Sequence, residues 1–332
     1  MRITYVFRAS GTGHSIETLF NAIYDEVNQL PSLTATAVQL PHISRGLRSV
    51  WQNLRFLAKQ NVGGLVHITG DVYYAALALP RSRTILTFHD CVLLDKHKGN
   101  PVRYALFWLL WYYIPIRRAA VITAISEKTR QELIHYVGKV GRKIMVVPNA
   151  YAPFFTYQPR RFNQEGPVLL QIGTAPHKNI LRLIEAIEHF PCRLIIVGSL
   201  SDKMTNRLRA RHIAYENYLN LNQTAIMQLY SVCDMVTFVS LYEGFGMPIL
   251  EANAVGRPVV TSNRSPMTEV GGKAACYVDP TDVSAIREGI LKVWHNSEYR
   301  AELIRYGLEN AQSYTVEKVA AQYEVLYAKL SS

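Results

Sequence analysis

The stretch that decides the fold is Ser240 to Glu251, which reads Ser-Leu-Tyr-Glu-Gly-Phe-Gly-Met-Pro-Ile-Leu-Glu. It follows an apolar run, Met235 to Val239, that predicts a buried strand, and an apolar segment from Pro248 onward predicts a helix. Gly244 and Gly246 therefore lie where a strand turns into a helix. Such a junction exposes backbone N–H groups at the positive end of a helix dipole, and glycine lets charged oxygens approach them closely.

Two carboxylates bracket this turn. Glu243 lies at its rim, and Glu251 lies just inside the predicted helix. A carboxylate beside an anion-binding turn repels the anion, so its expected partners are hydroxyl groups. A nucleotide sugar carries both phosphate and many hydroxyls, and we expect such a ligand here.

The same residues resemble a known family. The pattern Glu243, seven residues, Glu251, with Gly-Phe-Gly-Met-Pro between, resembles the signature of the retaining GT-B glycosyltransferases of family GT4. Two later segments continue the resemblance in the family's order, Ala254 to Ser262 and Thr268 to Gly272. The resemblance implies an α/β fold of the GT-B type, with two Rossmann-like domains whose parallel sheets face each other across a cleft.

The domain organisation follows from length and from one Pro- and Gly-containing segment. A chain of 332 residues suits two domains of roughly 150 residues each. The linker is predicted over Tyr151 to Gly166. With the resemblance, we expect an acceptor-side domain over residues 1–155, a nucleotide-sugar-binding domain over 156–312, and a C-terminal helix over 313–332 that packs back on the first domain.

Composition excludes several classes of protein. Hydrophobic residues make up 49% of the chain, which excludes a disordered segment. The cysteines are far apart in the sequence and form neither a CxxC pair nor a metal-binding pattern, which is typical of buried thiols in a reducing compartment. Met1 to Phe7 predicts a strand at once, with no secretory leader before it. We therefore expect a cytoplasmic protein.

The net charge of +11 is unevenly distributed. Residues 1–161 hold 20 Lys and Arg against 8 Asp and Glu, whereas residues 162–332 hold 16 against 17. No zinc-finger, RNP or basic-zipper pattern accompanies the basic half, so nucleic acid is not an expected partner. An anionic membrane surface or a lipid-diphosphate acceptor fits better, which would place the protein peripherally on the inner face of the cell membrane.

Two segments of the basic half bear on membrane contact. Ile43 to Gln60 predicts a basic amphipathic helix, which can lie in a membrane interface or cover the core with its basic face in water. Tyr104 to Ile116 is the most apolar stretch but is too short to span a bilayer, which needs about 20 residues. It predicts either a buried helix or one that enters the interface.

Candidate site residues follow two strands of the first half. Gly11 and Gly13 follow the first strand, in a loop that lacks the full GxGxxG spacing of dinucleotide sites. His89 and Asp90 follow the strand Thr84 to Phe88, at the end where parallel sheets bind ligands. The resemblance implies that the glycine loop faces the sugar, that His89 approaches the donor sugar, and that Asp90 lies on the acceptor side. The alternatives are a turn without a ligand and a structural histidine.

The second half opens with a similar arrangement. The strand Val168 to Ile172 is followed by Thr174 and by Lys178, the latter at a predicted helix start. A cation there can neutralise a diphosphate, although it can also be a solvated lysine. Many family members carry Arg at the position of Thr174, so Lys178 is the main candidate cation in this chain. The resemblance places loops that cradle the nucleobase over residues 212–221.

The resemblance also implies an activity. It implies a retaining hexosyltransferase in polysaccharide biosynthesis that requires neither cofactor nor metal, and the sequence contains no Asp-x-Asp motif. The donor is expected to be GDP- or UDP-linked, with mannose favoured, and the acceptor a glycan or a lipid-linked sugar. Catalysis is assigned to His89 and Glu243, and the donor site to the residues Gly11, Gly13, Thr174, Lys178, Gly244, Phe245, Gly246, Met247 and Glu251.

Other functions share this architecture. A nucleotide-sugar epimerase would turn over its substrate without an acceptor. A glycogen-type phosphorylase is disfavoured by the short chain. A non-catalytic carbohydrate-binding protein would bind nucleotide without transferring sugar.

Overall fold

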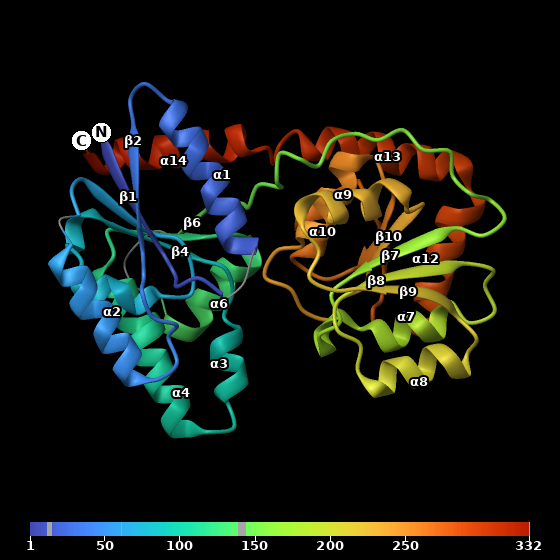
Figure 1. Cartoon of the computed structure of the whole chain (residues 1–332), viewed down its shortest axis with the longest axis horizontal. Coiled ribbons are helices and arrows are strands. Elements are labelled where there is room, and N and C mark those ends of the chain that lie inside the picture. The colour runs from blue at the N-terminus through green and yellow to red at the C-terminus, as the bar shows by residue number, and fades with distance from the viewer. Residues whose placement is uncertain (12–14, 61, 139–143, 332) are drawn as a thin grey trace. The chain divides into compact units, whose positions relative to one another are not determined.

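The computed structural model describes residues 1–11, 15–60, 62–138 and 144–331, so the predicted site residue Gly13 lies outside the described residues. The chain divides into two compact units (Figure 1). Unit 1 comprises Met1–Ala150 and Val316–Ser332, and unit 2 comprises Tyr151–Thr315.

Unit 1 is built on a six-stranded sheet in the order β2-β1-β3-β4-β5-β6, in which all pairings are parallel. The strands are β1 (Arg2–Phe7), β2 (Thr34–Gln39), β3 (Leu65–Ile68), β4 (Thr84–Phe88), β5 (Val121–Ala124) and β6 (Ile144–Val146). The strands β3 and β4 are buried along their whole length because a parallel sheet is covered on both faces.

Helices of unit 1 cover both faces of this sheet. Alternate side chains of the strands enter two different cores, since successive residues of a strand point to opposite faces. Tyr5 and Ile85 belong to one core, and their neighbours Val6 and Leu86 to the other. The helical elements are α1 (Ser15–Gln29), α2 (Leu47–Lys59), η1 (Tyr73–Ala78), η2 (Arg81–Arg83), α3 (Val92–His97), α4 (Pro101–Phe107), η3 (Trp108–Tyr113), α5 (Ile114–Arg118), α6 (Glu127–Val137) and α14 (Val316–Ser331).

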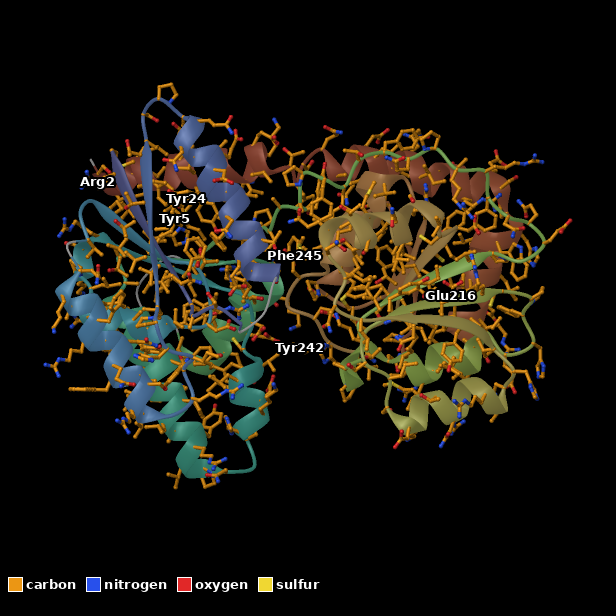
Figure 2. The ribbon with its side chains drawn as sticks, in the orientation of Figure 1. Arg2, Tyr5, Tyr24, Glu216, Tyr242 and Phe245 are labelled. Atoms are coloured by element: carbon orange, nitrogen blue, oxygen red, sulfur yellow. The ribbon has the colours of Figure 1, made fainter. Side chains whose placement is uncertain are left out.

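The last helix of the chain, α14, completes the core of unit 1. It packs with α1 on the face that Tyr5 enters, where Tyr5 and Tyr24 meet edge to face with ring centroids 6.0 Å apart (Figure 2). The Tyr327 hydroxyl lies 2.9 Å from the Tyr5 hydroxyl and 2.7 Å from Nδ1 of His67. Burial lowers the pKa of His67 to about 3, so this ring is neutral. A polar network therefore ties α14 to the sheet.

Unit 2 has a second six-stranded parallel sheet in the order β12-β11-β10-β7-β8-β9. Its strands are β7 (Val168–Ile172), β8 (Arg193–Val197), β9 (Ala214–Tyr218), β10 (Met235–Phe238), β11 (Val259–Ser262) and β12 (Cys276–Val278). Its helical elements are η4 (Pro176–Lys178), α7 (Ile180–Ala186), α8 (Asp202–Ala210), α9 (Gln223–Val232), α10 (Met247–Val255), α11 (Met267–Gly271), α12 (Val283–His295) and α13 (Ser297–Ala311).

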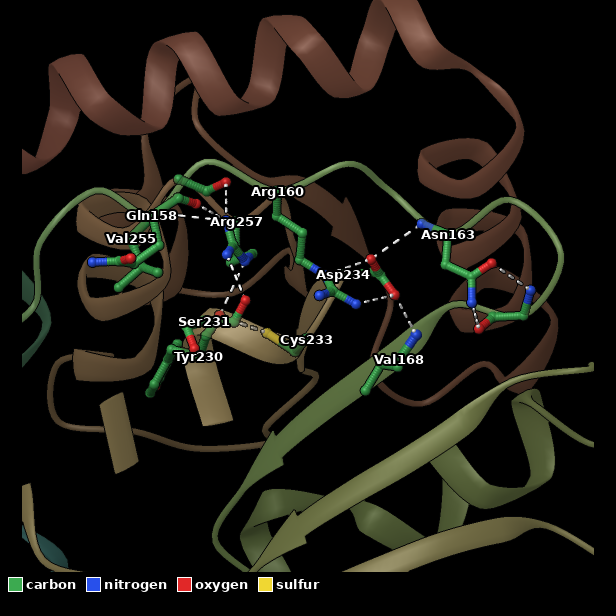
Figure 3. A network of polar contacts seen from close by, with 12 residues as sticks. Gln158, Arg160, Asn163, Val168, Tyr230, Ser231, Cys233, Asp234, Val255 and Arg257 are labelled. Atoms are coloured by element: carbon green, nitrogen blue, oxygen red, sulfur yellow. Dashed lines mark hydrogen bonds and ion pairs between the residues drawn. The ribbon is translucent and has the colours of Figure 1, made fainter. Parts of the chain in front are cut away.

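The predicted linker, Tyr151 to Gly166, has no helix or strand but is fixed to unit 2 (Figure 3). The buried carboxylate of Asp234 accepts hydrogen bonds from Nε of Arg160 at 2.8 Å and from the backbone N–H groups of Asn163 and Val168. This one side chain therefore fastens the segment at the point where it enters the first strand of unit 2.

A buried cation holds the earlier part of the same segment. Arg257 is 3% exposed and donates to the carbonyl oxygens of Gln158 and Ser231, each at 2.8 Å, and of Tyr230 at 3.0 Å (Figure 3). Burial lowers the pKa of this guanidinium, and the surrounding carbonyl groups replace its lost hydration. Arg257 lies within the Ala254 to Ser262 segment that resembles the family, and its contacts are structural.

Three local expectations need correction. The helix expected over Ile43 to Gln60 begins only at Leu47, after Gly46 with φ of 101°. The stretch Tyr104 to Ile116 is not one regular helix, because a π-helical segment, η3, separates α4 from α5. The expected nucleobase loops over 212–221 contain the edge strand β9. Among the described residues, no helix combines the length and hydropathy needed to cross a bilayer.

Candidate functional site

The order of strands in unit 2 places two loops side by side. From β7 the chain runs outward through β8 and β9 and then returns to β10, on the other side of β7. Loops that leave the carboxyl ends of two such neighbouring strands diverge, and open α/β sheets bind ligands in the space between them. Here the loops are joined, because the backbone N–H of Leu241 donates to the carbonyl of His177 at 2.7 Å.

An ion pair links the two loops at their side chains. Nζ of Lys178, after β7, lies 2.7 Å from Oε1 of Glu243, after β10, and both side chains are mostly buried. The ammonium also lies over the ring of Phe238, 4.7 Å from its centroid. The structure therefore brings together the predicted phosphate-binding cation and the predicted catalytic carboxylate.

Glycine is required at two places in these loops. Gly173 has φ of 87°, and a Cβ there would lie 2.9 Å from Cε of Lys178, so the lysine chain folds across the glycine. Gly246 has φ of 125° and precedes the first residue of α10. Its conformation turns the chain from the loop after β10 into that helix, whose N-terminal residue Met247 lies at the positive end of the helix dipole. Pro248 has no N–H, and the N–H of Ile249 donates to the carbonyl of Gly246 at 3.0 Å.

Glu251 lies on α10 and is held by a residue from another helix. The hydroxyl of Tyr230, on α9, donates to Oε2 of Glu251 at 2.5 Å. Burial is the main cause that raises the pKa of Glu251 to about 7, while the Tyr230 hydrogen bond and the Lys178 charge act in the opposite direction. Burial also raises the pKa of Tyr230, so it remains a donor at neutral pH. The Tyr230 hydroxyl therefore orients the Glu251 carboxyl group, which changes between its protonated and ionised forms near neutral pH.

Asn179 fixes the loop that carries Lys178. This buried residue adopts a left-handed conformation with φ of 62°. Its Nδ2 donates to the carbonyl of Val239 at 3.0 Å and to the carbonyl of Pro280 at 2.6 Å, so it joins the loops after three strands, β7, β10 and β12. The sequence offered one signal for this role, a polar residue between a loop and an apolar helix.

The other predicted donor residues of unit 2 lie in the same loops. The Thr174 hydroxyl donates to the carbonyl of Ser199 at 2.7 Å. Phe245 is buried, with its ring edge to face with that of Tyr314, so its backbone rather than its side chain is available to a ligand (Figure 2). Met247 is the first residue of α10 and is partly exposed.

Unit 1 carries a second pocket at the matching point of its own sheet. Its strand order reverses between β1 and β3, and the loops after these strands supply Arg8 and Asp71 to a pocket of about 400 Å³. The loop after β4 adds Asp90. Four aromatic residues also line the pocket, and we call them its aromatic wall: Tyr73, Phe107, Trp111 and Tyr112.

Charges in this pocket are organised around one guanidinium. Arg8 pairs with Glu17 through two nitrogens and with Asp71 through Nη1, which is 2.8 Å from Oδ2. Asp90 accepts the backbone N–H of Val92 at 3.0 Å. Burial, followed by repulsion from Asp71, raises the pKa of Asp90. Arg8, Glu17 and Asp71 were not among the predicted site residues, although each of Arg8 and Asp71 follows a strand end.

His89 is buried behind this pocket. Its Nε2 lies 2.7 Å from the carbonyl oxygen of Thr69, and since a carbonyl only accepts, Nε2 carries the proton. Burial lowers the pKa of His89, which favours the neutral ring. Gly11, exposed with φ of 81°, follows β1 in the same unit. The roles of His89 and Gly11 toward a donor sugar stay predictions.

Two family models match this sequence. One, described as glycosyl transferases group 1, matches residues 156–310, and the other, described as glycosyltransferase family 4, matches residues 12–153. The chain belongs to glycosyltransferase family 4. The two matches together cover most of both units, and the loops after β7 and β10 lie within the first of them.

Curated relatives of this glycosyltransferase include several mannosyltransferases. It is 29% identical over 271 residues to O-antigen chain mannosyltransferase B of Escherichia coli, covering 72% of this chain and 68% of that protein. It is 24% identical over 276 residues to O-antigen chain mannosyltransferase RfbU of Salmonella typhimurium, covering 79% and 75%. It spans only 32% of the serotype-specific mannosyltransferase WbdA of Escherichia coli, at 25% identity. These similarities support a hexosyltransferase.

Solved structures give the fold of this glycosyltransferase. Sucrose-phosphate synthase from Thermosynechococcus elongatus superposes with a TM-score of 0.79 at 15% identity, with 99% of each chain covered. Anabaena HepE, in complex with UDP and glucose, superposes with a TM-score of 0.78 at 15% identity, covering 99% of this chain and 100% of that one. The fold is GT-B, as expected from the sequence.

Proposed function

We propose that this glycosyltransferase transfers mannose from GDP-mannose to a hydroxyl of a glycan acceptor, with retention of the anomeric configuration and without a metal ion. The observation that carries the proposal is the arrangement in unit 2. There Lys178 and Glu243, from the loops after β7 and β10, lie with the N-terminus of α10 and with Glu251 on that helix. The mannosyltransferase relatives favour mannose among the hexoses.

The donor diphosphate would lie on the Gly244 to Gly246 turn. The backbone N–H of Met247, the dipole of α10 and the ammonium of Lys178 would stabilise the negative charge that grows on the leaving nucleoside diphosphate. A lysine and a helix start supply the charge stabilisation that a divalent ion supplies elsewhere, which supports metal-independent transfer. Because Lys178 is paired with Glu243, the diphosphate would displace the carboxylate from it.

The two carboxylates would bind hydroxyl groups. Glu251 is oriented by Tyr230 with its other oxygen available to accept hydrogen bonds from the ribose hydroxyls. Glu243, once released from Lys178, would accept from hydroxyls of the hexose. This division explains why both carboxylates lie beside an anion-binding turn, where neither can bind the anion itself.

The pocket of unit 1 fits the acceptor. Its aromatic wall suits the apolar face of a sugar ring, and Asp71 and Asp90 can accept hydrogen bonds from the ring hydroxyls. Asp90 retains the acceptor-side role that the sequence suggested. A glycan end therefore fits this pocket better than a free phosphate, which the two carboxylates would repel.

A donor screen tests the proposal. Thermal shifts would be measured with GDP, UDP, ADP and their mannose or glucose conjugates, with and without EDTA. A ligand that binds only the native state raises Tm by mass action. We expect GDP-mannose to give the largest shift, unchanged by EDTA, and Glu251→Gln to reduce it. The Glu302→Gln variant, which changes an exposed carboxylate on α13 away from the donor loops, is the matched control.

Transfer and stereochemistry complete the test. Incubation with GDP-mannose and a mannose-terminated oligosaccharide should give a product whose new linkage has the donor's α configuration by NMR. A β linkage would contradict retention. Loss of nucleotide sugar without any acceptor would favour the epimerase alternative, and nucleotide binding without transfer to any glycan would favour a non-catalytic protein.

A further inference from the structure

Unit 1 exposes apolar side chains on two helical segments. On α2, Leu47 is 62% and Trp51 is 57% exposed. Across α4 and η3, Val102 is 78%, Leu106 is 38% and Leu109 is 39% exposed. Residues spaced four and three apart lie on one side of a helix, so each segment presents an apolar stripe to the solvent.

Basic side chains accompany both stripes. The guanidinium of Arg55 lies 5.3 Å from the centroid of the Trp51 ring, and that of Arg117 lies 5.6 Å from the ring of Tyr113. Arg48 and Arg103 are also exposed. Neither residues 27–70 nor residues 96–126 contain an Asp or Glu. The charge excess of the N-terminal half is therefore concentrated around exposed apolar groups and is not offset locally.

The two segments border one pocket. Ile43, just before α2, and Phe107, at the end of α4, both line the candidate acceptor pocket of unit 1. Both α2 and η3 also pack against η1. We call the exposed residues of these segments the basic apolar surface. Its members are Ile43, Leu47, Arg48, Trp51, Arg55, Lys59, Val102, Arg103, Leu106 and Leu109.

We propose that the basic apolar surface docks unit 1 on an anionic lipid bilayer. A membrane interface accepts aliphatic and indole groups among its headgroups and pairs cations with lipid phosphates, so it satisfies both kinds of side chain at once. Nucleic acid would pair with the cations but leaves Leu47, Val102 and Leu106 without apolar partners. Docking would place the acceptor pocket beside the bilayer, where a lipid-linked glycan presents its end.

Vesicle binding by the full chain tests this surface. Sedimentation would compare vesicles of phosphatidylcholine with vesicles that contain about 30% phosphatidylglycerol. Each basic residue near an anionic surface adds about a factor of five to the partition coefficient. We expect binding to the anionic vesicles, weakened roughly 25-fold in Arg48→Gln/Arg55→Gln and also weakened in Leu47→Ala/Trp51→Ala.

A charge-matched control separates a surface from a general charge effect. Lys203 and Arg209 are exposed on α8 of unit 2, and their double replacement by Gln removes the same net charge. That variant should bind vesicles as the unaltered protein does. An equal loss in this control and in Arg48→Gln/Arg55→Gln would contradict a defined docking surface.

Tryptophan fluorescence locates the contact. All four tryptophans are described: Trp51 is 57% exposed, Trp108 is partly buried, and Trp111 and Trp294 are buried. Anionic vesicles should shift the emission of Trp51 to shorter wavelength, and most of the shift should be lost in Trp51→Phe. The variants Arg48→Gln/Arg55→Gln, Leu47→Ala/Trp51→Ala and Trp51→Phe should still glycosylate a water-soluble acceptor. Failure of membrane docking is therefore distinguishable from failure of the proposed transfer. Absence of vesicle binding, or binding of transfer RNA in its place, would overturn the proposal.

Discussion

Glu251 is the residue whose chemistry depends most directly on pH. Its raised pKa of about 7 means that the folded protein favours the protonated form. Protonated Glu251 therefore adds to the free energy of unfolding. This contribution is complete at pH values below the ordinary carboxyl pKa, and it is lost as the pH rises through about 7. Donor binding has the opposite dependence, because only the ionised carboxylate accepts hydrogen bonds with both oxygens.

We predict that the KM for the donor falls roughly tenfold between about pH 6 and pH 8, because the fraction of ionised Glu251 rises over that interval. Steady-state kinetics across this range measures it. Glu251→Gln should give a high KM that does not change with pH. Tyr230→Phe removes a hydrogen bond that lowers the pKa, so it should move the midpoint to higher pH. The same profile in all three proteins would exclude Glu251 as the titrating group.

The Lys178 and Glu243 pair predicts a separation of binding from transfer. Lys178→Met should weaken GDP binding, whereas Glu243→Gln frees the lysine and should leave GDP binding intact or tighter. Loss of one electrostatic group at a reacting centre typically costs about 10²–10³ in kcat, and we expect a loss of this size in Glu243→Gln. Calorimetry with GDP and transfer assays measure the two effects. Full transfer by Glu243→Gln would remove this residue from the catalytic site.

Motif spacing indicated Glu243, Glu251 and Lys178 from the sequence, but not their pairing. Lys178 and Glu243 are far apart along the chain and meet only because β7 and β10 are neighbours in the sheet. Tyr230 lies on a helix with no motif, so its contact with Glu251 depends entirely on packing. Asn179 likewise required knowledge of which loops converge.

At the scale of secondary structure, Asn179 joins loops that belong to three strands. We predict that Asn179→Ala lowers the stability of unit 2 by roughly 2–4 kcal/mol, because two buried carbonyls lose their donor and alanine is strained at positive φ. Thermal unfolding measures the loss. Asn179→Gly removes the same two hydrogen bonds but adopts positive φ without strain. If this variant were as stable as the unaltered protein, the hydrogen bonds would contribute little.

The sequence predicted the positions of buried strands well, but it did not reveal a strand that is partly exposed. The central strands β4, β7 and β10 are apolar runs that the sequence located within a residue. The edge strand β9 reads Ala-Tyr-Glu-Asn-Tyr, and its partial exposure permits polar residues that resemble a loop. The π-helical η3 was also not predictable, since an apolar run carries no signal for the extra residue in a turn.

At the scale of the whole molecule, the two units divide the proposed substrates between them. Unit 2 holds the candidate donor loops and unit 1 the candidate acceptor pocket. The sequence predicted two α/β domains, and the family resemblance implied that a C-terminal helix over 313–332 packs back on the first of them. The structure assigns the chain after Thr315 to unit 1. Nothing in the local pattern of α14 shows which core it joins, because its buried positions would suit either sheet.

We predict that deletion of residues 316–332 unfolds unit 1 and leaves GDP binding by unit 2. Six buried side chains of α14 leave the core, of which the aliphatic Val316, Val319 and Leu326 each contribute about 1.5–3 kcal/mol. Together with Ala320, Tyr323 and Tyr327, their sum is comparable to the stability of a typical domain. Limited proteolysis and thermal shifts with GDP measure the two units separately. Tyr327→Phe, which removes only a hydroxyl, should keep unit 1 folded. A protease-resistant unit 1 in the deletion variant would contradict this prediction.

The position of α14 has a consequence for synthesis on the ribosome. Met1–Ala150 is translated before unit 2 and lacks one wall of its core until Val316–Ser331 has emerged. Unit 2, which is continuous in sequence, can finish folding while unit 1 is still incomplete. The apolar face that α14 covers thus remains available to chaperones throughout elongation. Unit 1 completes its folding after unit 2, although most of unit 1 is synthesised earlier.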